Sequence, residues 1–427
     1  MDTIFAVSSG APPAAIAVLR ISGTRAFAAA EALTGALPQS RRAALRPVRD
    51  SDGVLLDRAV VLLFPGPDSS TGEDVAELHL HGGRAVVRAV EAALAVIPGL
   101  RPAEPGEFTR RALANGRIDL TEAEALGDLL MAETETQRRA AIRNMEGGLR
   151  RQVEGWTTEV LGLAAQVEAL LDHDDEGDVA SLAHPLPVLA REAGALAMRI
   201  AGATAGPTVE RLRDGVRVVL AGPPNAGKST LFNYLVEREA AIVSPIAGTT
   251  RDRLEAPVAR GGIAWLLIDT AGLAEATEDV IERIGIERAR NALAEADLVL
   301  WLGDDAPPQH PRLIPIHARC DQRGRGHSGD RLAVSAATGE GIAELWDRMT
   351  SLAREILLPP DSIAINRRQR DLLETVTTAL RDAEREADAL LFAEHLRTAR
   401  AALDRITGRA DVEAMLDTLF ARFCIGK

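Results

Sequence analysis

The sequence predicts a multidomain chain with an amino-terminal α+β domain, a central helical bundle and an inserted α/β domain whose sheet is mostly parallel. Three observations support this fold class. Residues 1–117 alternate short apolar runs with Gly and Pro, which is typical of α+β domains. From Thr121 onward, apolar residues recur at helical spacing over about twelve turns. An apolar run at 216–220 then leads into a glycine-rich loop and a second helical pattern.

Length and composition limit the function classes. At 427 residues with 46% hydrophobic residues, the chain is expected to form several packed domains and not a disordered polymer. The formal net charge of −13 argues against a general electrostatic nucleic-acid binder. The two cysteines, Cys320 and Cys424, are too few for a metal cluster. No signal-peptide pattern opens the sequence and no apolar run reaches membrane-spanning length, so we expect a cytoplasmic protein without a membrane segment.

The amino-terminal domain, 1–117, is expected to contain short strands and two helices. The expected strands cover 15–21, 59–64 and 75–80, and the expected helices cover 25–33 and 85–96. On the third strand, His79 and His81 would share a face with Glu77. A hydrogen-bonded polar face is the more common outcome for such a pair, with a metal site as the alternative. Arg110, Arg111 and Arg117 would either be solvated ion pairs or clamp an anionic ligand.

Helical patterns flank the inserted domain on both sides. The capping-box pattern Thr121-x-x-Glu124 predicts the start of a long helix, and Gly147-Gly148 can break or kink it. Residues 118–213 would form the first part of the helical domain and 355–427 the second part. Because the helices before and after 214–354 can pack into one bundle, the simplest architecture makes 214–354 an insertion.

The stretch Gly222-Pro-Pro-Asn-Ala-Gly-Lys-Ser-Thr230 is typical of a phosphate-binding loop, because a buried strand precedes it and a helix follows. Backbone N–H groups of the loop would surround a phosphate at the helix N-terminus. Lys228 would reach the β- and γ-phosphates, and the Ser229 hydroxyl would bind Mg²⁺. The expected nucleotide contacts here come from Asn225, Ala226, Gly227, Lys228, Ser229 and Thr230.

The motifs that follow the loop indicate GTP as the nucleotide. A threonine in Gly248-Thr-Thr-Arg-Asp252 can close over the γ-phosphate, and Asp269-Thr-Ala-Gly272 can hold Mg²⁺ through water and sense the phosphate. Asp321, just past a strand, can accept hydrogen bonds from guanine that adenine cannot offer. The loop after the next strand can donate a backbone N–H to the guanine oxygen. The expected contacts beyond the phosphate loop are Thr249, Thr250, Asp269, Gly272, Asp321, Ser335, Ala336 and Ala337.

Two positions depart from the common GTPase pattern. Ala318-Arg319 stands where that pattern has Asn-Lys, so guanine affinity and selectivity are expected to fall. Leu273 stands where a glutamine orients water, so hydrolysis needs another group or is slow. The candidates are Glu275, Glu278, Glu282 and a cation. Asn225 could hold a monovalent cation against the phosphates or could simply stabilise the loop.

Over nearly its entire length, the chain resembles the MnmE (TrmE) tRNA-modification GTPases. The motifs that carry the resemblance are Asp2-Thr-Ile, Leu19-Arg-Ile-Ser-Gly23, Thr71-Gly-Glu-Asp74, His81-Gly-Gly83, Pro105-Gly-Glu-Phe108, Asp119-Leu, Glu122-Ala-Glu124, the phosphate loop, Gly248–Asp252, Asp269–Leu273, Glu282-Arg-Ile-Gly-Ile-Glu287 and Cys424-Ile-Gly-Lys427. The Glu282–Glu287 motif and the terminal Cys-Ile-Gly-Lys are specific to this family and are not general to GTPases.

The resemblance implies a Ras-like G domain activated by potassium-dependent dimerisation. It assigns catalytic roles to Glu282, Lys228 and Arg251, with Glu282 orienting water. It further implies Mg²⁺ at Ser229 and Thr250, and K⁺ at Asn225, Ser244, Ile246 and Thr249.

For the amino-terminal domain, the resemblance implies a homodimerising, folate-binding-like domain that holds 5-formyl-tetrahydrofolate. The matching positions are Arg20, Glu77, Arg117 and Lys427. Arg117 replaces the lysine of many members. Cys424 matches the family's terminal cysteine, which is either a functional thiol or a buried structural one.

By family, the partners would be tRNA and MnmG, a flavin- and NADH-using protein, in a heterotetramer or larger complex. Together they attach an aminomethyl or carboxymethylaminomethyl group to C5 of the wobble uridine, U34. One alternative is a GTP-regulated assembly protein of the ribosome-assembly type, which would be expected to carry a basic RNA-binding module. Another, motivated by Ala318, is a degenerate G domain that binds nucleotide weakly.

Overall fold

The computed structural model describes residues 2–174, 186–204, 209–237, 240–241, 255–270, 291–322, 329–357, 363–410, 413–420, 423 and 426. The chain divides into two compact units. One consists of Met1–Gly127 with Leu403–Lys427, and the other of Asp128–Ala402. The domain boundaries at 117, 213 and 354 stay predictions.

The first unit is built on a six-stranded sheet with the order β3-β4-β5-β2-β1-β6. The strands are β1 (Thr3–Val7), β2 (Ile16–Ser22), β3 (Ala44–Arg49), β4 (Leu55–Phe64), β5 (Val75–His81) and β6 (Leu100–Pro102). Neighbouring strands are antiparallel except β1 and β6, which are parallel. β1, β3 and β6 are strands beyond the three that the sequence predicted.

Alternation of side chains along these strands gives the sheet two different faces. One face is buried under α1 (Ala26–Thr34) and α2 (Arg84–Ala95), with Leu19, Ile21, Leu78 and Leu80 in its core. On the other face a smaller cluster joins Ile4 and Ala6 to Phe108 of α3 (Glu107–Ala114). Arg20 and Glu77 alternate with the core residues of β2 and β5, so they lie away from the main core.

The helical region from residue 120 is divided into three helices, α4 (Leu120–Leu130), α5 (Glu135–Met145) and α6 (Gly148–Asp174). The capping box predicted at Thr121 and Glu124 is wrong. Asp119 is the capping residue instead, because its Oδ1 accepts from the Glu122 N–H while the Glu122 carboxylate accepts from the Asp119 N–H. The predicted break at Gly147 is confirmed, with a φ of +79° between α5 and α6.

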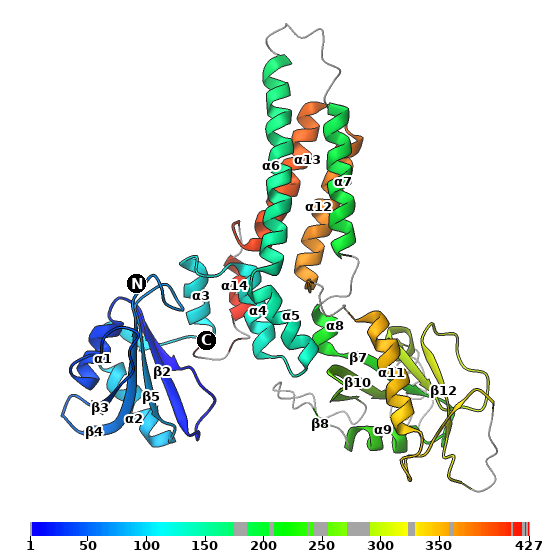
Figure 1. Cartoon of the computed structure of the whole chain (residues 1–427), viewed down its shortest axis with the longest axis horizontal. Coiled ribbons are helices and arrows are strands. Elements are labelled where there is room, and N and C mark those ends of the chain that lie inside the picture. Colours follow the sequence, from blue (N-terminus) through cyan, green and yellow to red (C-terminus); the bar gives the residue numbers. More distant parts are fainter. Residues whose placement is uncertain are drawn as a thin grey trace, which may run out of the picture. The chain divides into compact units, whose positions relative to one another are not determined.

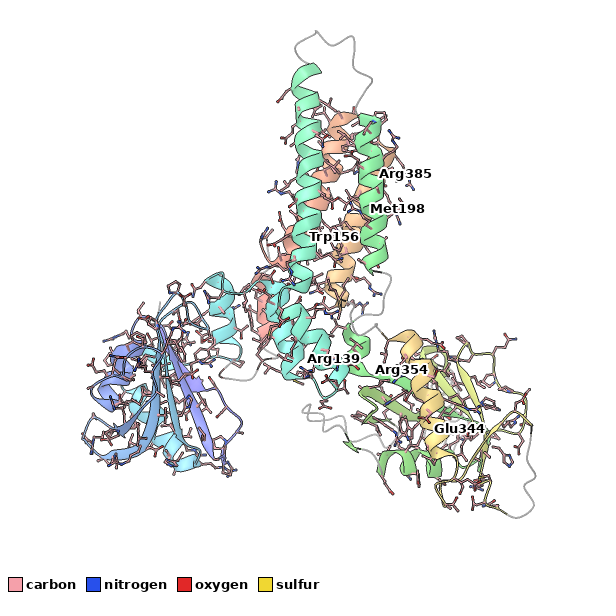
Figure 2. All side chains as sticks on the ribbon, viewed as in Figure 1. Arg139, Trp156, Met198, Glu344, Arg354 and Arg385 are labelled. Carbon is pink, nitrogen blue, oxygen red and sulfur yellow. The ribbon has the colours of Figure 1, made fainter. Side chains whose placement is uncertain are left out.

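The predicted bundle is confirmed, because α7 (Leu186–Thr204), which precedes the inserted domain, packs along α12 (Arg367–Arg385), which follows it (Figure 1). α6 and α13 (Ala389–Thr407) complete this bundle. Trp156 of α6 is buried, whereas Met198 projects from the outer side of α7 (Figure 2). In the described part of the chain, no helix combines the length and apolar character needed to cross a membrane.

The inserted domain is a seven-stranded, mostly parallel sheet with the order β13-β12-β11-β7-β10-β9-β8. Its strands are β7 (Val216–Ala221), β8 (Ala240–Ala241), β9 (Glu255–Arg260), β10 (Ile263–Asp269), β11 (Leu298–Trp301), β12 (Leu313–Ala318) and β13 (Leu332–Val334). Among these strands β9 runs against the others, because it pairs antiparallel with both β10 and β8. The helices of this region include α8 (Val209–Asp214), α9 (Lys228–Glu237) and α11 (Ile342–Ile356), and residues 291–295 are also helical. The predicted fold class is confirmed.

Candidate functional site

The loop between β7 and α9 has the backbone of a phosphate cradle. β7 is almost wholly buried in the middle of the sheet, as parallel strands covered on both faces require. The backbone then turns through left-handed conformations at Gly222, Asn225 and Gly227, with φ values of 147°, 60° and 99°. Asn tolerates this region better than most residues, so the backbone alone gives Asn225 a structural role. Whether it also holds a cation stays a prediction.

Lys228 lies at the first turn of α9 and is buried, with 6% of its surface exposed. Its Nζ donates to the carbonyl oxygens of Gly222 and Pro223, at 2.9 Å each. Burial lowers the pKa of the Lys228 ammonium, and the charge of Asp269 opposes that shift. A buried cation that is held by its own loop is one that an anionic phosphate would stabilise further.

Asp269 ends β10 and is nearly buried. The parallel register pairs it with Leu220, so the carboxylate lies beside the start of the phosphate loop. The adjacent Thr270 donates its Oγ1 proton to the Leu220 carbonyl at 2.8 Å, which fixes this end of β10 against β7. Ser229 and Thr230 are exposed at the start of α9. A carboxylate, a hydroxyl and an ammonium therefore share one edge of the sheet, and this donor set fits Mg²⁺ with phosphate.

The predicted base-recognition residues lie at the ends of β12 and β13. Ala318 is buried at the end of β12, and Asp321 is exposed two residues beyond Arg319. Arg319 has a φ of +59°, and its Nε would lie 3.3 Å from a Cβ placed on Gly227. The base loop and the phosphate loop are therefore in close contact through this arginine.

Ser335, fully buried after β13, shapes the second part of the base-recognition region. Its Oγ accepts hydrogen bonds from the N–H groups of Ala337 and Thr338, at 3.2 and 3.1 Å. This turn sets the course of Ala336 and Ala337. Their predicted contact with guanine stays a prediction.

The predicted folate residues are partly brought together in the first unit. Arg20 donates through Nε and Nη2 to Glu77 Oε1, at 3.0 and 2.8 Å, across the β2–β5 pair. The Arg20 guanidinium also lies 5.7 Å from the centre of the Phe108 ring. Arg117 instead forms an ion pair with Asp68, at 3.6 Å.

The chain end reaches the same sheet. The Gly426 carbonyl accepts from Ser8 Oγ at 2.7 Å, immediately after β1, and β1 pairs with β2 so that Ala6 lies opposite Arg20. Lys427 itself lies outside the described residues. Its neighbour Gly426 nonetheless lies beside the strand that borders Arg20, which is compatible with the predicted site.

Several predicted residues lie outside the described residues. These are Ser244, Ile246, Thr249, Thr250, Arg251, Gly272, Glu282, Cys424 and Lys427.

The two histidines of β5 bind carboxylates. His81 Nδ1 contacts Asp57 Oδ1 at 2.7 Å, and His79 Nε2 lies 3.4 Å from Glu77 Oε2. Within the ranges that the structure describes, no group of three or more His, Cys, Asp or Glu side chains is arranged to hold a metal. The hydrogen-bonded polar face is therefore favoured over the metal alternative.

Arg111, which was expected to form a solvated ion pair or to clamp an anion, instead belongs to a buried charge network around α3. Arg101 and Arg111 both bind Glu107 and Asp2, and Arg111 also reaches Glu73. Hydrogen bonds from Arg101 lower the pKa of the Asp2 carboxyl. Burial acts to raise the pKa of the Glu107 carboxyl, but hydrogen bonds from Arg101 and Arg111 outweigh burial, so this pKa is also lowered. The signal in the sequence was the unusual number of charges in 101–111, but two of their partners, Asp2 and Glu73, are far away along the chain.

Comparison with known proteins gives full-length matches. The family model described as the MnmE helical domain matches residues 120–424, and that of the GTP-binding protein TrmE N-terminus matches residues 3–117. The tRNA modification GTPase MnmE of Erythrobacter litoralis is 58% identical to this chain, and that of Rhizorhabdus wittichii is 57% identical. These alignments cover 100% of this chain and 100% and 97% of the relatives. Among solved structures, the G domain of the T. maritima FeoB iron transporter covers 32% of this chain and 98% of its own, at 27% identity and a TM-score of 0.25.

Proposed function

The chain belongs to the MnmE family of tRNA modification GTPases and is a GTP hydrolase, and we propose that it uses GTP hydrolysis to drive a conformational step in C5 modification of the tRNA wobble uridine, U34. It would act with MnmG to attach an aminomethyl or carboxymethylaminomethyl group. The observation that carries the proposal is the identity of 58% over the entire chain. The phosphate cradle with the buried Lys228 supports it independently.

For the nucleotide site, we propose that Lys228 binds the β- and γ-phosphates and that Ser229, Thr250 and Asp269 hold Mg²⁺ directly or through water. Mg²⁺ would neutralise charge that develops on the phosphates. Asp321 would read guanine, and Arg251 would assist catalysis. The described part of this set, Lys228, Ser229 and Asp269, lies at one sheet edge.

For activation, we propose that K⁺ binds at Asn225, Ser244, Ile246 and Thr249 and promotes dimerisation of the G domains. A cation there would neutralise transition-state charge in place of an arginine finger. Glu282 would orient water, because Leu273 cannot. The left-handed Asn225 in the loop is compatible with this proposal.

For the first unit, we propose a homodimerising domain that binds 5-formyl-tetrahydrofolate through Arg20, Glu77, Arg117 and Lys427. A carboxylate-bearing, hydrogen-bonding ligand could replace or share the present Arg20–Glu77 and Arg117–Asp68 pairs. Cys424 remains either a functional thiol or a structural one. We place the protein in the cytoplasm, with tRNA as the shared substrate of a complex with MnmG.

The test is GTP hydrolysis by the full chain in potassium and in sodium, with the wild type and Glu282→Ala. Potassium should stimulate the wild type strongly. Glu282→Ala should lower the stimulated rate by roughly 100-fold, the scale of one precisely placed catalytic group, while nucleotide affinity is kept. Equal rates in both salts, or an unaffected Glu282→Ala, would refute the activation mechanism. A wobble uridine that stays unmodified in a reconstitution with MnmG would refute the proposed role in tRNA.

A further inference from the structure

Three side chains of α5 donate hydrogen bonds to main-chain carbonyls that lie in or beside the inserted domain. Thr136 Oγ1 donates to the Gly262 carbonyl at 2.8 Å, and Gln137 Nε2 donates to the Leu212 carbonyl at 2.8 Å. Asn144 Nδ2 donates to the Ala364 carbonyl at 2.7 Å. All three acceptors are backbone carbonyls, so these bonds hold the path of the chain and do not depend on the identity of a partner side chain.

Two of these bonds lie at the starts of the strands that carry the nucleotide site. Gly262 is in the tight turn that joins β9 to β10, where Gly261 and Gly262 have φ values of 63° and 77°. Leu212 is in α8, which leads directly into β7. β7 and β10 are parallel neighbours, paired from Trp265 and Val216 to Asp269 and Leu220. One helix turn therefore holds both strands at the end opposite to the phosphate loop and Asp269.

β10 is stiff enough to carry a displacement along its length. Trp265 is 1% exposed, its Nε1 donates to the Arg260 carbonyl at 3.2 Å, and its ring meets the Trp346 ring edge-on at 5.5 Å. The Arg260 guanidinium covers Trp346 at 5.0 Å from the ring centre. Because close-packed interiors move as units, a shift of Asp269 would reach the Gly262 turn and Thr136.

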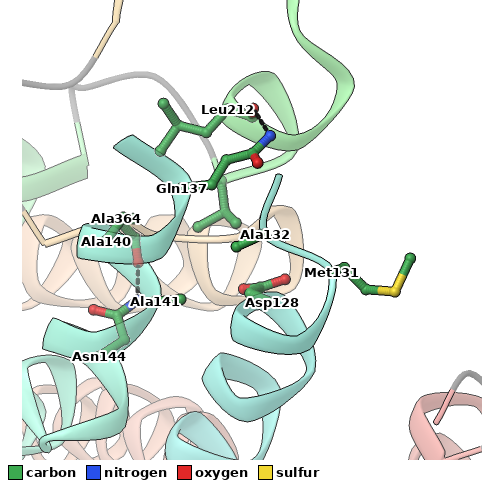
Figure 3. Close-up of a pocket in the computed structure, with 10 residues that line it drawn as sticks. Asp128, Met131, Ala132, Gln137, Ala140, Ala141, Asn144, Leu212 and Ala364 are labelled. Carbon is green, nitrogen blue, oxygen red and sulfur yellow. Dashed lines mark hydrogen bonds between the residues drawn. The ribbon is translucent and has the colours of Figure 1, made fainter. Parts of the chain in front are cut away.

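A small void lies where α5 meets α4, α8 and Ala364. A cavity of about 20 Å³, roughly the room for one water, lies beside α5 and is lined mainly by apolar atoms (Figure 3). Asn144 lines it with a side chain that is 5% exposed, and its Oδ1 has no hydrogen-bond partner in the described part of the chain. The cavity is bordered by Gln137 and its acceptor Leu212 and by Asn144 and its acceptor Ala364, so two of the three bonds lie beside a small void into which α5 can shift at low cost.

We propose that α5 relays the nucleotide state of the G domain to the helical domain, with Thr136 and Gln137 as positioning residues that act through β10 and β7. This inference rests on the proposed function, because it requires a G domain that alternates between nucleotide states. None of the bonds described above joins Thr136 or Gln137 to the phosphate loop or to Asp269. Removing either donor would therefore uncouple α5 without removing a nucleotide contact.

The test is hydrogen exchange in the α5 segment, 135–145, of the full chain, with GDP and with a non-hydrolysable GTP analogue. In the wild type, exchange in this segment should differ between the two nucleotides. Thr136→Val keeps the shape of the side chain but removes its donor. It should reduce that difference about fivefold, because the loss of one neutral hydrogen bond changes an equilibrium constant by about that factor. Thr136→Ser keeps the donor and should preserve the difference. Both variants should bind nucleotide as the wild type does.

Gln137→Glu provides a second, independent variant. Gln137 Oε1 accepts from the N–H groups of Thr134 and Glu133, so glutamate can keep this cap while losing the Nε2 donor to Leu212. It should also reduce the nucleotide-dependent difference. If the wild type hydrolyses GTP but exchanges equally in both nucleotide states, the inference is overturned and the proposed function stays intact. The same holds if Thr136→Val and Gln137→Glu both keep the full nucleotide-dependent difference. A wild type that does not hydrolyse GTP overturns both.

Discussion

Ala318 is expected to weaken base recognition although the surrounding backbone is kept. It lies at the buried end of β12, and the next residue, Arg319, takes a left-handed conformation and lies against Gly227. The backbone route to Asp321 is therefore in place, but the amide that would join the base to the phosphate loop is missing. Arg319 supplies contact between the two loops without that hydrogen bond.

Ala318→Asn should strengthen guanine-nucleotide binding. One added neutral hydrogen bond is worth about 1 kcal/mol, so the Kd for GDP should fall about fivefold and the preference for GDP over ADP should rise. Calorimetric titration with both nucleotides measures this. Ala318→Val adds bulk without an amide and is the control; a gain of equal size in Ala318→Val would show that packing and not hydrogen bonding is responsible.

His317 is the neighbouring residue on β12 and is 6% exposed, with no hydrogen-bond partner for either ring nitrogen among the residues described. Burying polar atoms without partners costs free energy. His317→Leu should therefore raise the free energy of unfolding by roughly 1 kcal/mol, as measured by urea denaturation.

His310 offers a matched comparison. Its Nδ1 lies 2.8 Å from the Arg312 carbonyl oxygen and 3.1 Å from the Arg312 backbone nitrogen, and its Nε2 lies 3.2 Å from the Ala296 carbonyl oxygen. His310→Leu should lower the free energy of unfolding, because it leaves two backbone groups without these bonds. If both leucine variants change stability in the same direction, the absence of partners at His317 is not the cause.

At the scale of elements, local patterns were predictable and long-range contacts were not. The phosphate loop was located because its strand, glycines and helix are consecutive in sequence. The capping residue of α4 was misplaced because Asp119-x-x-Glu122 and Thr121-x-x-Glu124 are both valid patterns two residues apart, and packing decides between them. β3 and β6 were missed because partly exposed or very short strands give little periodic signal.

The candidate sites follow the same division. Lys228 and Asp269 were assigned from their own motifs, whereas the Arg20–Glu77 pair depends on the register of β2 against β5, which no local pattern reveals. The network of Arg111 with Asp2 and Glu73 joins three distant segments. Its members could be noticed in the sequence, but their partners could not be assigned without the sheet topology.

The start of α3 depends on close approach to α14 (Glu413–Phe420). Gly106 has a φ of +69°, and a Cβ there would lie 2.8 Å from Phe420 Cβ and 2.9 Å from its carbonyl oxygen. Gly106→Ala should therefore lower the free energy of unfolding by about 1–3 kcal/mol for overpacking, beyond the cost of its backbone conformation. Thermal unfolding measures the change.

Gly116→Ala is the control for Gly106→Ala. Gly116 has a nearly equal φ of +66°, but a Cβ there would meet no atom within 4 Å. Gly116→Ala should carry only the backbone cost, about 1 kcal/mol. Equal destabilisation in the two variants would mean that contact between α3 and Phe420 contributes nothing to this unit.

At the scale of the whole chain, the first unit is assembled from both ends of the sequence. Residues after Leu403 belong with residues 1–127, and Ser8 binds Gly426 near the carboxyl terminus. The second unit, Asp128–Ala402, is continuous and contains the candidate nucleotide site. Each unit has its own apolar core, so each is expected to unfold as a cooperative body.

Calorimetry of the full chain should therefore show two unfolding transitions, each responding to a different ligand. GDP with Mg²⁺ at 100 times its Kd should stabilise the second unit alone by about 2.7 kcal/mol, because only native protein binds it. 5-Formyl-tetrahydrofolate should shift only the other transition if Arg20 and Glu77 bind it, and Arg20→Ala should abolish that shift. A single transition that both ligands raise would instead show that the two units unfold together, and a folate shift that survives Arg20→Ala would place the ligand elsewhere.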